Sequence, residues 1–426
     1  MKKILVFILF LLISQAPARA AAPAAPQGPV LTLEKCLQLA FDHHPDIVSS
    51  AWQVRRSGSQ VELAKSSGRP TLDLGASLSD SEGAETRSAS DISVKQLLTD
   101  GGKTRATIAG ATYDLSATRK EAERTWQERA YTVKEAYFNL LRAREDAAVA
   151  VETEALYETQ LKQAQAFYKA GSSSKIDVTT AEVNLSQARL DLAKANSSAS
   201  SAVAVLENEI GTALPGRDMP LQVPGEAAIS IPPLESAVGE AMSARVDVQA
   251  AEDRILSAKQ TLSATARGMS PSLYASGGWG FSDSSSGWDD EWTAGLSLSV
   301  PLYDGGATAA RTEAARADLE ITRSDRDKLR NSVRLEVETA LLDLETASQQ
   351  VKTAEAALRQ ARENLDLARG RYRVGVGTSL EVTDAAEKYS TAGKSLVQAR
   401  FDRQVAAAAL DSALGRPVGI PKEETK

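Results

Sequence analysis

Four short segments of the chain alternate apolar and polar residues with the period of two that is typical of β-strands. They cover about residues 70–79, 90–98, 271–281 and 291–300. The first two segments are separated by about ten mostly polar residues, and so are the last two. The pattern therefore predicts two β-hairpins, one in each half of the chain.

Outside the hairpins, apolar and alanine residues recur at spacings of three and four, as on one face of an α-helix. The two longest such stretches, about residues 103–170 and 306–374, contain no proline that would break a helix. A helix of about 68 residues is roughly 100 Å long. Shorter helices are expected at about residues 46–67, 175–210, 247–268 and 378–414. Stacked in pairs, they would nearly match the long ones, which predicts a rod of antiparallel helices.

The two halves of the chain repeat the same landmarks in the same order. Leu98–Gly102 has its counterpart in Leu302–Gly306, and Tyr168–Gly171 has its counterpart in Tyr372–Gly375, both about 204 residues later. Such ordered matches indicate the tandem duplication of a unit of roughly 200 residues. The expected divisions are a signal peptide (1–20), a first repeat (21–215), a connector (216–233), a second repeat (234–417) and a C-terminal tail (418–426).

Composition and charge narrow the possible functions. The chain has 49 Lys and Arg against 56 Asp and Glu, which gives no basic surface for a nucleic acid. Its single cysteine, Cys36, and its two adjacent histidines, His43 and His44, offer no metal site or distributed catalytic triad. We therefore expect no enzyme activity, no cofactor, no metal and no nucleic-acid partner.

The first 20 residues have the features of a secretory signal. Lys2 and Lys3 precede an apolar run of about ten residues, and Ala18-Arg19-Ala20 has the small-x-small pattern of a cleavage site. The run is too short to cross a bilayer as a helix, and no other segment approaches 18 consecutive apolar residues. We expect the signal to be cleaved and the mature chain to be exported.

The alternating strands are typical of a membrane β-barrel with apolar residues outside and polar residues inside. Three of the five tryptophans would form an aromatic girdle around one hairpin: Trp279, Trp288 and Trp292. A soluble, half-buried sheet is the alternative for any single strand. Four strands cannot close a barrel, and open edges in lipid are too costly to persist. Several copies must therefore contribute strands, eight strands for two copies or twelve for three.

These features together resemble the TolC-type outer-membrane efflux protein family. The resemblance covers about residues 31–417 and is carried by the duplication, the Asp-Gly-Gly turns at Asp100 and Asp304, and the segment Tyr372–Val382. It implies a homotrimer with a 12-stranded barrel in the outer-membrane lipid, continuous with a periplasmic α-helical tunnel. It also implies a periplasmic adaptor protein and an inner-membrane transporter as partners, with the connector forming an equatorial segment.

Two glycine-containing helix breaks would place both helical hairpin tips at one level of the rod. Glycine at such a break supplies the left-handed conformation that ends a helix. By resemblance, these turns also dock onto the adaptor. The residues concerned are Gly171, Ser172, Ser173, Gly375, Val376 and Gly377.

Glu381 and Asp384 lie three residues apart and share one face of a helix that begins near the second tip. By resemblance they form an acidic ring at a closed periplasmic gate, with Tyr372 as a hydrogen-bonding partner. For Glu381 the alternative is a helix cap, because Thr378-x-x-Glu381 matches a capping box. Some family members carry a latch arginine where this chain has Gly377, so the latch is in doubt, and nearby arginines could substitute.

The function expected from these observations is an exit duct of a tripartite efflux or type I secretion system. A periplasmic adaptor would have one helical hairpin and usually a membrane anchor, whereas a structural coiled-coil protein would leave the alternating strands unexplained. The cargo cannot be read from the sequence.

Overall fold

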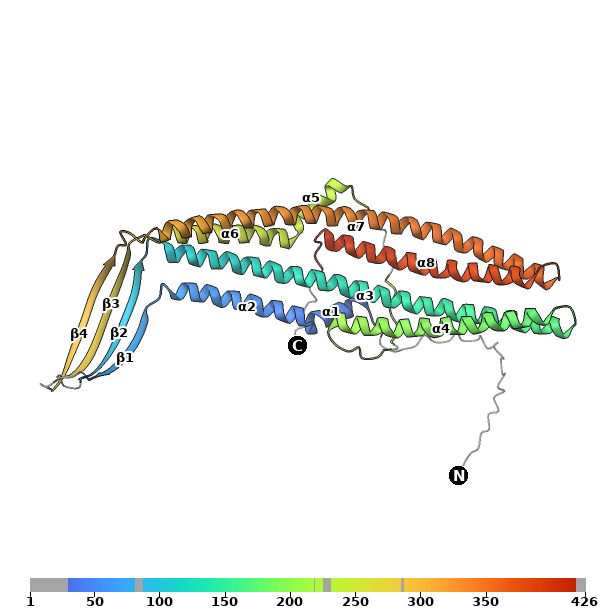
Figure 1. The fold of residues 1–426 in the computed structure, drawn as a ribbon, viewed down its shortest axis with the longest axis horizontal. Helices are drawn as coiled ribbons and strands as arrows, with labels where there is room; N and C mark the ends of the chain where they lie inside the picture. The colour runs from blue at the N-terminus through green and yellow to red at the C-terminus, as the bar shows by residue number, and fades with distance from the viewer. Residues whose placement is uncertain (1–29, 81–86, 218, 225–230, 285–286, 419–426) are drawn as a thin grey trace, which may run out of the picture.

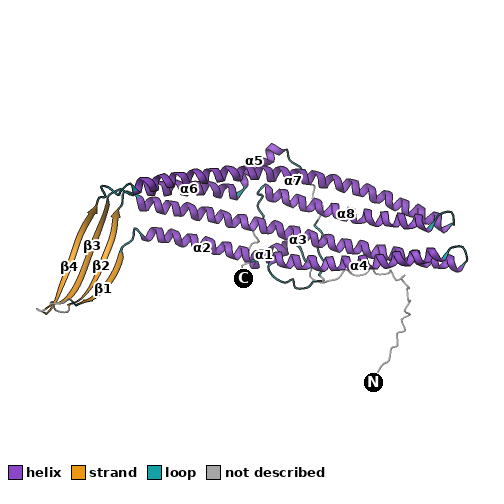
Figure 2. Ribbon diagram, viewed as in Figure 1, coloured by secondary structure: helices purple, strands orange, loops and turns teal. Residues whose placement is uncertain are grey.

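The computed structural model of this chain is an elongated molecule with strands at one end and helices along the rest of its length (Figures 1 and 2). It describes residues 30–80, 87–217, 219–224, 231–284 and 287–418. The predicted signal peptide and most of the predicted tail lie outside these residues. The predicted fold class is confirmed, since the described chain is mainly helical with one four-stranded antiparallel sheet.

The sheet has the order β1-β2-β3-β4 and consists of two hairpins that pair through β2 and β3. The strands are β1 (Thr71–Ser79), β2 (Arg87–Thr99), β3 (Ser272–Ser284) and β4 (Gly287–Ser299). The strands β2, β3 and β4 extend up to four residues farther toward the hairpin loops than the apolar alternation indicates. Backbone pairing continues there although most of the side chains are polar, because the ladder needs only N–H and C=O groups.

The strand register gathers the apolar residues on one face of the sheet. One row across the four strands consists of Leu74, Ile92, Trp279 and Trp292. The next row on the opposite face consists of Gly75, Asp91, Gly280 and Glu291. The apolar row is exposed in the single chain, with Leu74 and Trp292 each 77% exposed. The sheet is therefore polar on one face and apolar on the other, and neither face is covered by helices.

Two helices of 67 residues, α3 (Lys103–Lys169) and α7 (Ala307–Arg373), run almost the whole length of the rod (Figure 1). At 1.5 Å per residue each is roughly 100 Å long. Shorter helices lie beside them (Figure 1): α2 (Pro45–Ser66) and α6 (Val246–Ala266) near the sheet, α4 (Lys175–Ile210) and α8 (Ser379–Ala413) beyond them, and α1 (Leu33–His43) and α5 (Leu234–Ala244) midway along the rod.

The two halves of the chain meet along α3, which packs against α6 near the sheet and against α8 farther away. On its other side, α3 packs against α2 and α4. The order of helices across the rod is therefore α2-α3-α6-α7 near the sheet and α4-α3-α8-α7 beyond it. One margin consists of β1, α2 and α4, and the other of β4 and α7, so the same two sides are open in the sheet and in the helices.

Buried side chains concentrate midway along the rod, where α1 and α5 lie. Tyr137 of α3 is fully buried, and its hydroxyl donates to the carbonyl oxygens of Leu31 (2.9 Å) and Gln222 (2.7 Å). Arg144 donates to the carbonyl oxygen of Met219 at 2.6 Å. These bonds attach the described part of the connector to α3, at the middle of that helix (Tyr137) and about two turns beyond it (Arg144).

Candidate functional site

Both helical hairpins turn at the end of the rod that lies opposite the sheet (Figure 1). Gly171 and Gly375 have φ values of +75° and +79°, which favour glycine over residues with a side chain. After each glycine, a backbone N–H returns to the helix: Ser172 donates to the Phe167 carbonyl at 3.0 Å, and Val376 to the Arg371 carbonyl at 3.1 Å. The chain reversal at both tips thus follows from local glycine chemistry.

The two tips differ in the side chains that they present. The first tip is polar at Ser172 and Ser173, whereas the second exposes Val374 and Val376. Each is followed by an exposed apolar residue in the first turn of the next helix, Ile176 in α4 and Leu380 in α8. The sequence analysis did not select these last two residues, although they are equivalent in the two repeats.

The first tip is stabilised by Asp177 in the first turn of α4. Its carboxylate accepts a hydrogen bond from the Ser173 hydroxyl at 2.6 Å and from the backbone N–H of Ser174 at 3.2 Å. The bond from Ser173 contributes most to holding the pKa of Asp177 below its ordinary value. This is the acidic form of a capping box, and it engages the Ser173 side chain.

The second tip has a different arrangement around Glu381. The Thr378 hydroxyl oxygen accepts from the Glu381 backbone N–H at 3.2 Å, as in a helix cap. The Glu381 carboxylate instead lies 3.5 Å from the Arg371 guanidinium, which also donates to the Val376 carbonyl at 3.3 Å. Arg371 therefore bridges the end of α7, the turn and the start of α8.

Asp384 lies one turn farther along α8 and is exposed. Its carboxylate pairs with Lys388 at 2.7 Å. Glu381 and Asp384 thus come from the same part of α8, as the spacing predicts, and each has a cation beside it. The two carboxylates are therefore partly neutralised within one chain.

Tyr372, the third predicted gate residue, is buried between the two hairpins. Its ring packs edge-on against Phe167 of α3, with 5.3 Å between ring centroids. Its hydroxyl is buried and has no hydrogen-bond partner of normal geometry among the described residues. Burial, followed by the charge of Asp177, raises the pKa of this hydroxyl. Tyr372 joins the hairpins by an aromatic contact, which the sequence did not indicate.

Gly377 has no room for a side chain. A Cβ atom there would lie 2.9 Å from the Arg371 Cβ and 3.0 Å from the Tyr372 backbone nitrogen. A latch arginine at this position would require the turn to shift. Arg371, six residues earlier, supplies the cation at this turn instead.

Polar contacts also join the hairpins just behind the tips. Thr383 of α8 accepts hydrogen bonds from Gln160 of α3 at 2.8 Å and from Asn184 of α4 at 3.3 Å. Tyr389 donates to Glu152 at 2.9 Å. These partners are about 200 residues apart in the chain, and no sequence pattern connects them.

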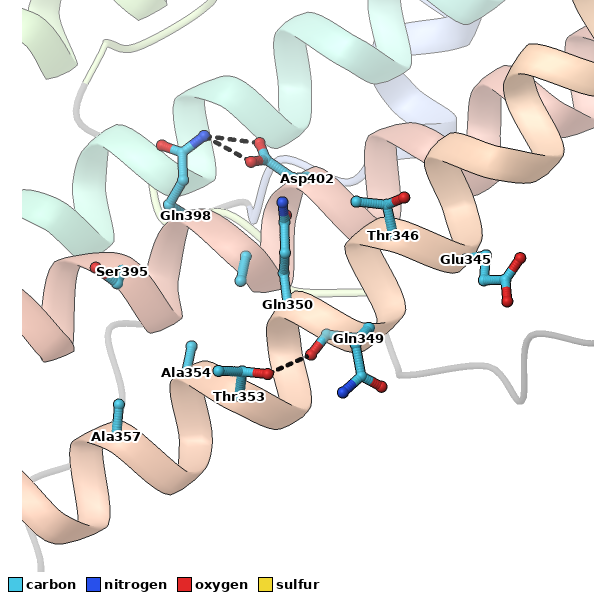
Figure 3. Close-up of a pocket in the computed structure, with 11 residues that line it drawn as sticks. Glu345, Thr346, Gln349, Gln350, Thr353, Ala354, Ala357, Ser395, Gln398 and Asp402 are labelled. Atoms are coloured by element: carbon cyan, nitrogen blue, oxygen red, sulfur yellow. Dashed lines mark hydrogen bonds between the residues drawn. The ribbon is translucent and has the colours of Figure 1, made fainter.

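A groove of about 810 Å³ runs between α7 and α8, between the tips and the middle of the rod (Figure 3). Figure 3 shows small or uncharged side chains around it, such as Ala354, Thr353 and Ser395. Asp402, at its margin, accepts two bonds of 2.8 Å from the Gln398 amide. The groove allows another surface to approach both helices closely.

The three predicted girdle tryptophans lie on the apolar face of the second hairpin. Trp279 and Trp292 are cross-strand partners, whereas Trp288 lies near the hairpin turn beyond Asp290. All three are exposed in the single chain. The three tryptophans therefore lie at two heights on one face of the sheet. Along β4, the unbroken series of apolar residues on this face ends at Trp292, because Asp290 separates it from Trp288.

Among the described residues, no group of three or more His, Cys, Asp or Glu side chains is placed to hold a metal ion. None of the helices described is both long enough and apolar enough to cross a membrane.

Comparison with known proteins agrees with this architecture. The chain is 27% identical over 394 residues to the outer membrane efflux protein BepC of Brucella suis. The aligned region covers 90% of this chain and 85% of BepC. It is 24% identical over 291 residues to the outer membrane protein TolC of Vibrio cholerae, covering 66% of each.

Solved structures show the same fold. The outer membrane protein VceC of Vibrio cholerae superposes with a TM-score of 0.78 at 20% identity, covering 90% of this chain and 96% of VceC. The CmeC outer membrane channel of Campylobacter jejuni gives a TM-score of 0.80 at 16% identity, covering 90% and 85%. The family model for outer membrane efflux proteins matches residues 36–212 and 237–416, one segment in each repeat. The chain therefore belongs to the outer membrane efflux protein family.

Proposed function

We propose that this protein is the outer-membrane exit duct of a tripartite efflux or type I secretion system. Three copies form a homotrimer in which twelve strands close a barrel in the outer-membrane lipid and the helices form a tunnel into the periplasm. The chain reaches this location as an exported protein whose signal peptide is cleaved. The family is one of transport proteins, which argues against an enzyme, a periplasmic adaptor or a coiled-coil filament.

The observation that carries this proposal is the pair of open margins on one chain. The sheet ends at β1 on one side and β4 on the other, and its apolar face is exposed. Unpaired strand edges in lipid cost several kcal/mol for each unsatisfied group. Because the two edges differ, joining copies edge to edge gives a heterologous contact, which forms a ring when the rotation between copies closes.

The helical margins support the same ring. Exposed apolar side chains lie along both of them, such as Trp52 of α2 and Val183 of α4 on one side, and Ile321 and Leu335 of α7 on the other. The arrangement that pairs β4 of one copy with β1 of its neighbour would also place the neighbour's helices over these residues. Three copies rather than two give a lumen wide enough for cargo.

Docking onto the adaptor and its pump is assigned to the two tips. Gly171, Ser172 and Ser173 form the first tip and Gly375, Val376 and Gly377 the second. The exposed Ile176, Val374 and Leu380 extend the docking surface with apolar area. Since the tips lie at the end opposite the sheet, a partner from the inner membrane would meet them first.

Glu381 and Asp384 are proposed as the gate at the tunnel entrance, held by Tyr372. In a trimer, six carboxylates would surround one axis and favour cations. Arg371 and Lys388 reduce this effect, because each lies against one of the carboxylates. The Tyr372 contact with Phe167 would keep the second hairpin against the first while the gate is closed.

The experiment that tests this function is photo-cross-linking in cells from Ser173 and Val376. Val376 is labelled rather than its neighbour Gly377, because Gly377 cannot hold a side chain without a shift of the turn. Asp289, exposed on the hairpin at the opposite end, is the control position. Capture of an adaptor from the tips and not from Asp289 supports the exit duct. Capture only of copies of the same chain, at good labelling efficiency, contradicts tip docking.

A further inference from the structure

A hollow of about 380 Å³ lies where the strands end and the helices begin (Figure 1). Side chains of three strands line it, together with residues at the helix ends. The strand residues are Leu97, Ser272, Tyr274 and Ser299. In the strand register they alternate onto the same face as Asp91 and Glu291. The hollow therefore opens on the polar side of the sheet, which faces the lumen under the proposed function.

A second hollow, of about 430 Å³, adjoins the first and lies between α3, α6 and α7. The two share Lys103, Thr107 and Gly268, and we call them together the junction cavity. One face of α6 forms its floor, with only small side chains: Thr261, Ala264, Thr265 and Gly268. Lys103 of α3 and Arg311 of α7 line it on either side of this floor. Two cations thus flank a surface without bulky groups.

The positive charge of these two side chains is not neutralised within the chain. Neither Lys103 nor Arg311 has an ion pair in the part of the chain that the structure describes. The nearest acids, Asp100 and Asp304, are engaged by the turns before α3 and α7. Each accepts a bond of 2.7 Å from a backbone N–H in the first turn of the helix that follows. These carboxylates therefore compensate the positive helix ends rather than the two side chains.

Other acids lie farther from the cavity floor. Asp114 is at the far end of the second hollow, seven residues or about 10 Å beyond Thr107 along α3. In the opposite direction, Asp91 lies six residues or about 20 Å beyond Leu97 along β2. An excess of positive charge is therefore confined to the junction cavity, between acidic stretches on both sides.

We propose that the junction cavity binds cargo through an anionic head group, a carboxylate or a phosphate, on a small organic molecule. The inference rests on the proposed function, because only a closed duct makes the polar side of the sheet a lumen. Lys103 and Arg311 would donate charge-assisted hydrogen bonds to the anionic oxygens. The small side chains of α6 leave room for the body of the molecule, and hollows of this volume are in the range of small-molecule sites.

The proposed gate does not select against such cargo. Arg371 and Lys388 lie against its two carboxylates, Glu381 and Asp384, and weaken their effect on an anion. The gate and the junction cavity also lie at opposite ends of the helices. A cation preference measured for the whole channel is therefore a property of the gate, and binding at the cavity has to be measured directly.

A neighbouring copy is not expected to fill the cavity. Its floor and its first wall belong to α6 and α3, which lie between the two open margins of the chain. The remaining alternative is water alone, since long cationic side chains at a surface can be solvated without any ligand. The test therefore has to separate a binding site for anions from two solvated cations.

The test compares two dyes that share a xanthene ring system and differ in charge, anionic fluorescein and cationic tetramethylrhodamine methyl ester. Fluorescence anisotropy measures the binding of each dye to the full chain in the uncharged detergent dodecyl maltoside, at neutral pH and at low and high salt. Empty micelles give the background. The cavity variant replaces Lys103 and Arg311 by Gln.

Two further variants make the comparison specific. Replacing Arg105 and Arg316 by Gln removes the same charge from the same two helices, and neither residue lines the cavity. Thr107→Trp instead fills the cavity without a change of charge. The Thr107 hydroxyl donates only within its own helix, to the Lys103 carbonyl at 3.1 Å, so this substitution breaks no tertiary bond.

Fluorescein should bind the native protein and the Arg105/Arg316 control equally, and the cavity variant about tenfold more weakly. Thr107→Trp should weaken binding as well, and added salt should weaken it in the native protein. The cationic dye should bind all four proteins poorly. Equal fluorescein affinities for the native protein and the cavity variant would overturn the site, and so would equal affinities of the two dyes for the native protein.

Currents through planar bilayers separate this inference from the proposed function. Fluorescein should reduce the current through native channels and have less effect on the cavity variant. Binding in detergent without any effect on the native current would overturn the assignment to cargo and leave the duct intact. Absence of channels from the native protein would instead refute the proposed function, and the cargo inference with it.

Discussion

Arg245 is a buried cation at the point where α5, α6, α7 and the end of α8 meet, and its removal gives the sharpest test of the packing. The side chain is 2% exposed. Its guanidinium donates to both oxygens of Asp247 (3.1 and 2.6 Å), to Glu336 (2.5 Å) and to the Ala413 carbonyl (3.3 Å). The Arg245→Met variant keeps much of the volume and removes every one of these bonds.

The loss of stability in Arg245→Met depends on how well the carboxylates that lose their partner can be compensated. Removing one partner of a buried ion pair costs about 3–5 kcal/mol, because the other charge stays buried. Asp247 is only 18% exposed, but Glu336 is 43% exposed and can be rehydrated. Arg124 also remains 3.8 Å from Asp247. We therefore expect the lower end of the range, about 3 kcal/mol of destabilisation.

The pH dependence has a definite sign. Burial tends to raise the pKa of Asp247, but the bonds and charge of Arg245 outweigh it and hold the pKa below its ordinary value. In the native protein, Asp247 thus contributes stability above about pH 3.9, which is lost as the pH falls through its lowered pKa. In the variant, burial dominates and the folded-state pKa rises. The difference between the two proteins should therefore shrink from about pH 7 to about pH 4.

The assay is urea unfolding in detergent followed by far-UV circular dichroism, at one protein concentration and at both pH values. Arg254→Met is the matched control, because Arg254 lies on α6, the helix that begins directly after Arg245, and makes two bonds to Glu121 (2.8 and 2.9 Å) from an exposed position. Exposed pairs contribute about 0–1 kcal/mol. An Arg245→Met midpoint equal to that of Arg254→Met would refute the reasoning, and so would a difference from the native protein that grows at low pH.

Four further predictions concern the gate, the tips and the buried thiol. Replacing Glu381 by Gln together with Asp384 by Asn should raise conductance and lower cation preference in planar bilayers, because the pore loses its carboxylates. If neither value changes, these residues are not the gate. Replacing Tyr372 by Ala should lower stability by about 3 kcal/mol through loss of the buried ring, whereas Phe should be tolerated because the unpaired hydroxyl adds little; equal thermal unfolding of both variants would contradict this. Replacing Gly377 by Arg should reduce adaptor cross-linking from the tip rather than create a latch, and undiminished capture would show that the turn can adapt. Burial raises the pKa of the Cys36 thiol to about 12, so maleimide should not label the folded protein at about pH 8 but should label it in urea. Rapid labelling without urea would show that this part of α1 opens.

Several features could be predicted because they depend on neighbours in the chain. The period of two in residues 71–79 places every second side chain on one face, whatever the strand pairs with. The proline-free helices and the glycines at 171 and 375 likewise act within one or two turns. The duplication then placed the two tips at one level, since equivalent segments of equal length end at equal distances from the sheet.

The partners of the site residues could not be predicted in the same way. The capping-box pattern Thr378-x-x-Glu381 is not completed by the Glu381 carboxylate, because Arg371 returns across the second turn to reach it, whereas Asp177 does complete a box at the first tip. A hydrogen bond was expected for Tyr372, but the chain brings it against Phe167, from the other repeat. Such contacts depend on how α7 lies against α3, and no local pattern contains that information.

The sequence by itself determined the elements, their lengths, the apolar face of each strand and the need for further copies to close the sheet. Only the tertiary structure decided that β2 pairs with β3, that α3 joins the repeats by packing on α6 and α8, and that both open margins lie on the same sides of the rod. The physical reason is that side-chain periodicity specifies which surface must be covered. Which surface covers it is decided by the summed packing of residues about 200 positions apart.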